Sequence, residues 1–101
     1  MRRQPIDDGG WFDKDVARRW DEDQYHDGRN MISKATGSQW EHEALYRTRK
    51  GMYILCHESQ WQGVRPAWTR MTVAEAADWL TRNEHEPETR AERTAADAAE
   101  V

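Results

Sequence analysis

The sequence predicts an α+β fold: a small three-stranded antiparallel meander with a C-terminal helix packed on one face. Two observations predict this class. Two strand-like runs at about residues 42–48 and 52–58 flank a short connection that contains a glycine, as in a β-hairpin. Further along, Thr72 and Glu75 have the spacing of a capping box and precede a stretch with helical periodicity.

Length and composition favour one folded domain with polar ends. Leu, Ile, Val and Phe together number only eleven in 101 residues, which is typical of disorder. Six tryptophans offset this deficit, because each buried indole removes about 150–250 Å² from water. We therefore expect a flexible lead at residues 1–10, a single domain at 11–83 and a disordered acidic tail at 84–101.

The first part of the domain has the weakest pattern. Phe12, Val16 and Trp20 are spaced by four residues, which predicts a short helix in the stretch WFDKDVARRWDED. Residues 24–39 contain Asp-Gly and Thr-Gly-Ser sequences and are expected to form a loop.

The meander is expected to be centred on its second strand. The run from Met52 to Cys56 shows no alternation of polar and apolar residues, which indicates a central strand covered on both faces. A third strand is predicted at about residues 65–71, and Pro66 marks it as an edge strand.

The predicted helix follows Thr72 and ends at Asn83. Its expected buried stripe has the spacing i, i+3, i+4, i+7 and consists of Val73, Ala76, Ala77 and Leu80. Trp79 lies at the border of that stripe.

The sequence provides no clear catalytic or metal site. Cys56 and His57 are adjacent on a predicted strand and so point to opposite faces, which argues against a shared metal ion or a Cys/His nucleophile pair. Three glutamates of the hairpin, Glu41, Glu43 and Glu58, could converge as an acid/base set, but exposed positions in solvent are the favoured interpretation. Glycine-rich phosphate-binding loops are also missing. We expect no metal, no cofactor and no enzymatic activity.

Recognition of a macromolecule is the favoured interpretation, because aromatic and cationic residues alternate around the hairpin. The residues we select for binding are Trp61, Trp68, Arg49, Lys50 and Arg65, with the rings as anchors and the cations as orienting groups. Trp61 stands in a polar turn and is either an exposed anchor or a ring folded back over the sheet edge. For the other rings, a place in the core competes with a binding role.

Three segments resemble a known type of protein. "TGSQWEHEALYRTRKG", "SQWQG" and "EAADWL" are similar to a family of short, functionally uncharacterised bacterial proteins, over roughly residues 25–85. The resemblance implies a bacterial origin and an intracellular location, but no activity, ligand or catalytic residue.

The predicted function is therefore non-catalytic binding of another macromolecule, most readily a protein, by a cytoplasmic protein without a membrane segment. Net charge is -4, which argues against a general polyphosphate binder. Residues 31–70, however, carry an excess of basic side chains, so single-stranded nucleic-acid binding by the same sheet face is one alternative. A mobile-element inhibitor of the anti-defence type is another. The exposed edges of a short meander also leave a homodimer open.

Overall fold

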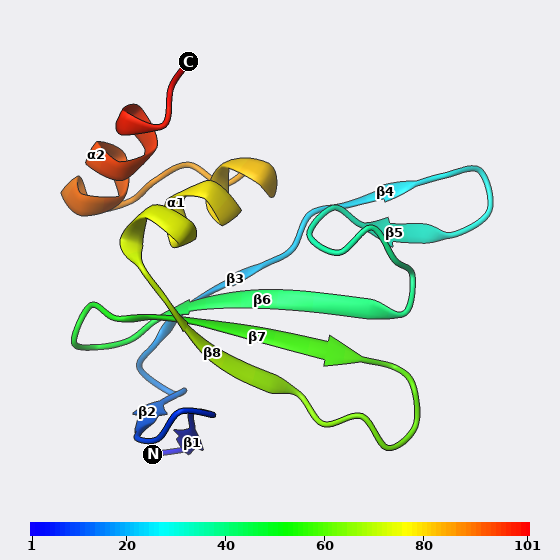
Figure 1. Ribbon diagram of the computed structural model, residues 1–101, viewed down its shortest axis with the longest axis horizontal. Coiled ribbons are helices and arrows are strands. Elements are labelled where there is room, and N and C mark those ends of the chain that lie inside the picture. Colours follow the sequence, from blue (N-terminus) through cyan, green and yellow to red (C-terminus); the bar gives the residue numbers. More distant parts are fainter.

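The computed structural model describes residues 1–101. The chain forms eight strands and two helices, joined by turns and loops (Figure 1). The predicted α+β class is confirmed, but a three-stranded meander understates the sheet content. The elements are β1 (Arg3–Pro5), β2 (Trp11–Asp13), β3 (Arg18–Asp21), β4 (Gln24–His26), β5 (Met31–Ser33), β6 (Glu41–Arg47), β7 (Tyr53–Ser59), β8 (Ala67–Met71), α1 (Val73–Arg82) and α2 (Arg90–Ala98). Four strands form the central sheet, and β1–β2 and β4–β5 are separate hairpins.

The central sheet is antiparallel, with the strand order β3-β6-β7-β8. Strands β6 and β7 form the predicted hairpin within one residue of its expected bounds, and Arg47 pairs with Tyr53 beside the turn. The two predictions for the neighbouring strands are also confirmed. Strand β7 lies inside the sheet, and β8, which follows Pro66, lies at its edge.

One side of the sheet, the hairpin face, is covered by the β1–β2 hairpin. Its buried residues are Ala44, Tyr46, Ile54, Cys56 and Trp68, and the covering residues are Ile6 and Phe12. The Phe12 ring lies 5.3 Å from the Tyr46 ring and 5.9 Å from the Trp68 ring, between centroids. Aromatic rings at such distances pack favourably in tilted arrangements, so they supply the bulk that the scarce aliphatic residues do not.

The opposite side, the helix face, is covered by α1. Trp20, Leu45 and Tyr53 of the sheet pack against Ala76, Trp79 and Leu80 of the helix. The predicted capping box is present, because the Thr72 hydroxyl accepts a hydrogen bond from the Glu75 amide and the Glu75 carboxylate accepts one from the Thr72 amide.

The predicted buried stripe of α1 needs one correction. Val73 is 36% exposed, whereas Trp79 is only 1% exposed. The stripe therefore starts one turn later. It keeps the predicted Ala76, Ala77 and Leu80 and adds Trp79 and the helix C-cap Asn83. Burying the large indole removes more apolar surface from water than burying a valine, which favours this rotation of the helix.

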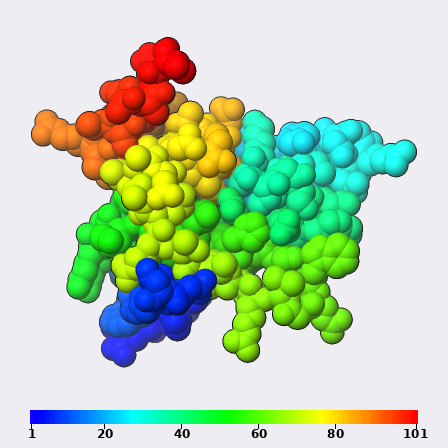
Figure 2. Space-filling model, viewed as in Figure 1, coloured from blue at the N-terminus to red at the C-terminus, as the bar shows by residue number.

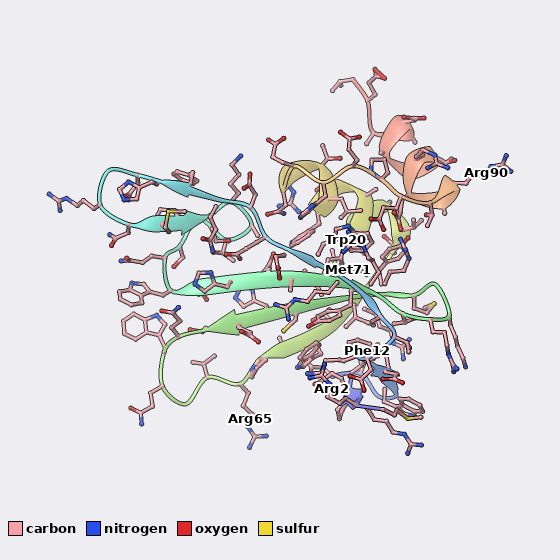
Figure 3. The ribbon with its side chains drawn as sticks, turned by 180° about the vertical axis from the view of Figure 1, so that it is seen from behind. Arg2, Phe12, Trp20, Arg65, Met71 and Arg90 are labelled. Carbon is pink, nitrogen blue, oxygen red and sulfur yellow. The ribbon has the colours of Figure 1, made fainter.

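The short helix predicted from Phe12, Val16 and Trp20 is wrong, because β2 and β3 occupy this stretch. Phe12 enters the hairpin face and Trp20 the helix face, on opposite sides of the sheet (Figure 3). Val16 lies in the turn between them and is 55% exposed. A helix with Phe12 and Trp20 on one face could not place these two rings in separate cores. The strands can, and they therefore bury more apolar surface than the predicted helix would.

The residues before β2 are also ordered, in contrast to the predicted flexible lead at 1–10. Ile6 is 6% exposed. Asp7 donates its amide to the Trp68 carbonyl at 3.0 Å, and its carboxylate accepts the Trp68 amide at 3.0 Å. These bonds cover the outer edge of β8, which would otherwise offer free backbone groups to another strand.

The loop predicted at residues 24–39 is wrong over β4 and β5, which form a hairpin projecting from the sheet (Figure 1). The Asp27 carboxylate accepts the amides of Arg29 and Asn30 and so closes the turn. Strands of three residues are too short to produce a recognisable alternation, which is why the sequence gives only the turn signal.

The predicted disordered tail at 84–101 is wrong as well, because it contains α2. Thr89 and Glu92 form a second capping box. Glu92 is fully buried and accepts hydrogen bonds from the Tyr53 hydroxyl and from Arg47 Nη1, both at 2.6 Å. A buried charge therefore anchors α2, which has no stripe of large apolar residues. Neither helix has the length and apolar character that crossing a bilayer requires.

Candidate binding surface

The structure separates the five predicted binding residues into three groups. Arg49 and Lys50 lie in the β6–β7 turn, while Trp61 and Arg65 lie in the β7–β8 connection, at the opposite end of the hairpin. The two ends are roughly 20 Å apart, since seven residues of strand separate them. Trp68 belongs to neither end.

Trp68 is a core residue, and this corrects its selection as an exposed anchor. It is 9% exposed and packs against both the Phe12 and the Tyr46 ring of the hairpin face. The indole is therefore needed for packing, as the competing interpretation of the sequence holds for the rings of the sheet. Its removal would damage the fold before it affected any partner.

The six tryptophans divide evenly between interior and surface. Trp20, Trp68 and Trp79 are between 1% and 9% exposed. The other three are about half exposed: Trp11 at 49%, Trp40 at 45% and Trp61 at 62%. The open question about Trp61 is thus answered in favour of exposure.

Trp61 forms an exposed pair with Trp40, which precedes β6. Their ring centroids are 5.6 Å apart and the ring planes are inclined by 46°. The Gln60 amide donates to the Trp40 carbonyl at 2.8 Å and so connects the two backbone segments beyond the last pair of the β6–β7 ladder. Sequence reasoning did not select Trp40.

The tripeptide Ser-Gln-Trp occurs twice, at residues 38–40 and 59–61, and this repeat could have indicated that Trp40 resembles Trp61. In each copy the serine hydroxyl accepts a hydrogen bond from the amide of the tryptophan two residues later, Ser38 from Trp40 at 2.9 Å and Ser59 from Trp61 at 3.2 Å. Such turns are a known use of serine side chains. The repeat therefore reflects the same local turn formed twice and brought together by the hairpin.

Other exposed apolar residues lie at the same end of the molecule. Tyr25 and Met31, on the β4–β5 hairpin, are 47% and 49% exposed, and Val64 in the β7–β8 connection is 54% exposed. Figure 1 shows this hairpin and this connection at one end of the sheet, and Figure 3 shows Arg65 projecting from the connection. We call the set Tyr25, Met31, Trp40, Trp61 and Val64 the open-end surface.

A buried carboxylate holds the β4–β5 hairpin in place behind this surface. The Glu22 side chain is 6% exposed and accepts hydrogen bonds from Ser33 Oγ at 2.8 Å, His42 Nδ1 at 2.7 Å and the Glu43 amide at 2.6 Å. Burial alone would raise the pKa of Glu22, but these hydrogen bonds outweigh it and lower the pKa. The ionised group thus connects β5, β6 and the residues after β3.

Two of the three candidate acid/base glutamates of the hairpin, Glu41 and Glu43, converge on His57, whereas Glu58 lies apart from them. His57 Nδ1 lies 2.9 Å from Glu43 Oε2 and its Nε2 lies 3.4 Å from Glu41 Oε1, while Glu58 is on the opposite face of the sheet, near Cys56. The hydrogen bond with Glu43 is the main cause that raises the pKa of His57. The expectation that Glu43 faces solvent is wrong, because its side chain is only 14% exposed and its other oxygen accepts the Trp79 indole N–H at 3.0 Å.

Cys56 and His57 point to opposite faces, as the strand alternation predicts. Cys56 is 3% exposed within the hairpin face. Burial, reinforced by the nearby Glu58 carboxylate, raises the pKa of its thiol to about 12. At neutral pH the thiol is therefore protonated and a poor nucleophile.

Comparisons with protein families, characterised proteins and solved structures find no match to this chain. The resemblance to short bacterial proteins stays a prediction.

Proposed function

We propose that this chain is a non-catalytic binding module that captures another protein through the open-end surface. The observation that carries the proposal is the exposed Trp40–Trp61 pair, held by two serine turns and a backbone hydrogen bond. A chain so poor in aliphatic residues leaves two indoles outside its cores at one place. Contiguous exposed apolar groups of this kind are typical of interaction sites.

The pair is suited to act as an anchor. Tryptophan is enriched among the residues that dominate interface energetics, and truncating such a residue costs about 2 kcal/mol or more. Because local hydrogen bonds already fix the backbone at both tryptophans and the two rings pack on each other, this surface loses less conformational freedom when a partner binds. Free rings on a mobile loop would bind more weakly for the same contact area.

The charge around the surface indicates the partner's chemistry. Arg65 projects from the β7–β8 connection and forms no ion pair within the chain (Figure 3). An apolar groove with carboxylates at its rim would complement two indoles beside such a cation. Cations at the rim of an interface contribute to orientation and association rate more than to affinity.

Nucleic-acid binding by the sheet face is less well supported. The rings that would stack on bases there, Tyr46, Tyr53 and Trp68, are 5%, 6% and 9% exposed, and the β1–β2 hairpin and α1 cover both faces. Among the exposed rings, only Trp11 on β2 lies outside the open-end surface. Weak dependence of binding on salt would favour a protein partner, since phosphate contacts produce a steep dependence.

The test is affinity capture from a bacterial lysate followed by binding measurements with the identified partner, which also decides whether that partner is a host defence protein. Trp61→Ser should weaken binding about 30-fold, the equivalent of 2 kcal/mol. Trp11→Ser is the matched control, because Trp11 is also half exposed but lies on β2. Equal effects of the two substitutions, or an unchanged affinity of the Trp61 variant, would refute the proposal.

A further inference from the structure

A second surface feature lies at the opposite end of the hairpin from the open-end surface. A cleft of about 340 Å³ separates the β1–β2 hairpin from the β6–β7 turn. Figure 2 shows the N-terminal segment in blue and this turn in green at one end of the molecule, away from the β4–β5 hairpin in cyan. The volume is near the lower limit of the roughly 300–1,000 Å³ usual for small-molecule sites.

The base of the cleft is lined by apolar and aromatic side chains. Ile54 and Phe12, which belong to the hairpin-face core, form part of the lining together with Trp11 and Met52. Trp11 and Met52 are 49% and 46% exposed. Arg3 lies against the Trp11 ring, 4.7 Å from its centroid, and so helps to fix the indole in position. A planar apolar group could pack on these two exposed side chains.

Cations surround the same cleft. Arg49, Lys50 and Arg70 contribute to its lining, against the single carboxylate of Asp13. The Asp13 Oδ1 atom already accepts the amides of Arg2 and Asp15. The lining therefore has a net positive charge, in a chain whose overall charge is -4.

Arg49 and Lys50 are free to bind a ligand. Neither forms an ion pair with any carboxylate of the chain. Their turn is nevertheless well defined, because the Thr48 amide donates to the Met52 carbonyl at 2.8 Å and the Gly51 amide to the Thr48 carbonyl at 2.9 Å. Gly51 has a φ of +82°, which an L-residue adopts only with strain.

Arg70 is fixed at the rim by the loop between β1 and β2. Its Nε donates to Asp8 Oδ1 at 3.0 Å and its Nη2 to the Gly9 carbonyl at 3.1 Å. A Cβ atom at Gly10 would lie 3.0 Å from Nη2, so glycine permits this close approach. The cleft thus has one cation held in place and two cations unpaired.

We propose that this cleft binds a small organic anion that joins one planar ring to a phosphate or carboxylate group. The ring packs on Trp11 and Met52, and the anionic group is bound by Arg49 and Lys50. Both groups are needed, because the cleft offers an apolar base and a cationic rim together. Its volume accommodates one ring system with one anionic group. This inference does not depend on the function proposed for the open-end surface.

Isothermal titration calorimetry with four probes tests the ligand class. Naphthyl phosphate and naphthoate carry both features, naphthol lacks the charge and inorganic phosphate lacks the ring. We expect the first two to bind, and naphthol and inorganic phosphate each to bind at least about tenfold more weakly. The ratio between naphthyl phosphate and naphthoate distinguishes a phosphate ligand from a carboxylate. No binding of either compound at about 1 mM, or equal affinity for naphthol, would overturn the proposal.

Substitutions locate the site. Arg49→Gln with Lys50→Gln should weaken naphthyl phosphate about tenfold, whereas Arg65→Gln, at the other end of the hairpin, should leave its affinity unchanged. Trp11→Leu should abolish most of the advantage of naphthyl phosphate over inorganic phosphate, and Trp61→Leu should not. All five substituted positions are exposed, so the variants should fold. If Arg65→Gln weakened binding as much as the Arg49 and Lys50 substitutions, or Trp61→Leu acted like Trp11→Leu, the cleft would not be the binding site.

Discussion

Replacing Glu92 by glutamine tests how the C-terminal helix is held. Glu92 is fully buried and is the only buried residue of α2. Burial by itself would raise its pKa, but hydrogen bonds from Tyr53, the Glu88 amide and Arg47 outweigh burial and lower the pKa from 4.5 to about 2. That difference corresponds to roughly 3 kcal/mol of stabilisation by the ionised form at neutral pH.

The expected result is local release of α2. Glutamine keeps the shape and the capping-box position of Glu92 but removes the charge that Arg47 and Tyr53 contact. An isolated helix of nine residues is unstable in water, so α2 should unfold once it is released. We expect the α2 amides to exchange with solvent roughly a hundredfold faster at pH 7 in the variant.

Glu75→Gln provides a matched control. Glu75 has the same position in the capping box of α1 but is exposed, so this substitution should leave exchange in α2 unchanged. The pH dependence gives a second check. Because the pKa of Glu92 is lower in the folded state, its contribution is complete above about pH 4.5 and is lost as the pH falls towards about 2. Equal exchange in wild type and Glu92→Gln at pH 7, or a difference that does not shrink in acid, would refute the reasoning.

Three further outcomes follow from the packing. Trp68→Ala should lower the free energy of unfolding by about 3–5 kcal/mol in urea titrations, and Trp61→Ala by less than about 1 kcal/mol, because only Trp68 is in the core; similar losses would contradict this division. Cys56 should not react with a thiol-specific disulfide reagent at pH 8 until the protein is denatured, since burial and a pKa of about 12 keep it protonated; rapid reaction of the folded protein would contradict its burial. Glu22→Gln should increase amide exchange in the β4–β5 hairpin more than in β7, because Glu22 accepts the Ser33 hydroxyl; uniform exchange would show that the carboxylate has no local role.

The sequence predicted the elements whose local signals agree with the tertiary structure. The β6–β7 hairpin has a strand-like run on each side of a glycine-containing turn, and α1 has a capping box followed by a periodic stripe. In both, the pattern extends over enough residues to define a period. Turn chemistry and capping then fix the boundaries to within about one residue.

The elements that were missed are short or depend on distant partners. The spacing of Phe12, Val16 and Trp20 fits a helix, but Phe12 and Trp20 are buried in two different cores, which only the complete sheet can create. Helix α2 has no apolar stripe that the sequence could reveal. Its buried residue is Glu92, whose carboxylate contacts Arg47 and Tyr53. Its capping box was the available signal, with the same Thr-x-x-Glu spacing as in α1.

The candidate surface was predictable in part. The polar neighbours of Trp61 left two interpretations open, of which the structure shows exposure, and the Ser-Gln-Trp repeat could have indicated Trp40. The position of Arg49 and Lys50 at the other end follows from the hairpin register. Trp68 could not be assigned from the sequence, because its burial depends on Ile6 and Phe12 of a hairpin that gives no periodic signal.

The most direct measurement follows the six indole N–H resonances in proton–nitrogen correlation spectra while the captured protein partner is added. The account predicts that the Trp40 and Trp61 signals shift or broaden, and that those of Trp20, Trp68, Trp79 and Trp11 do not. A complex that leaves the Trp40 and Trp61 signals unchanged would contradict the claim that the open-end surface is where this protein binds.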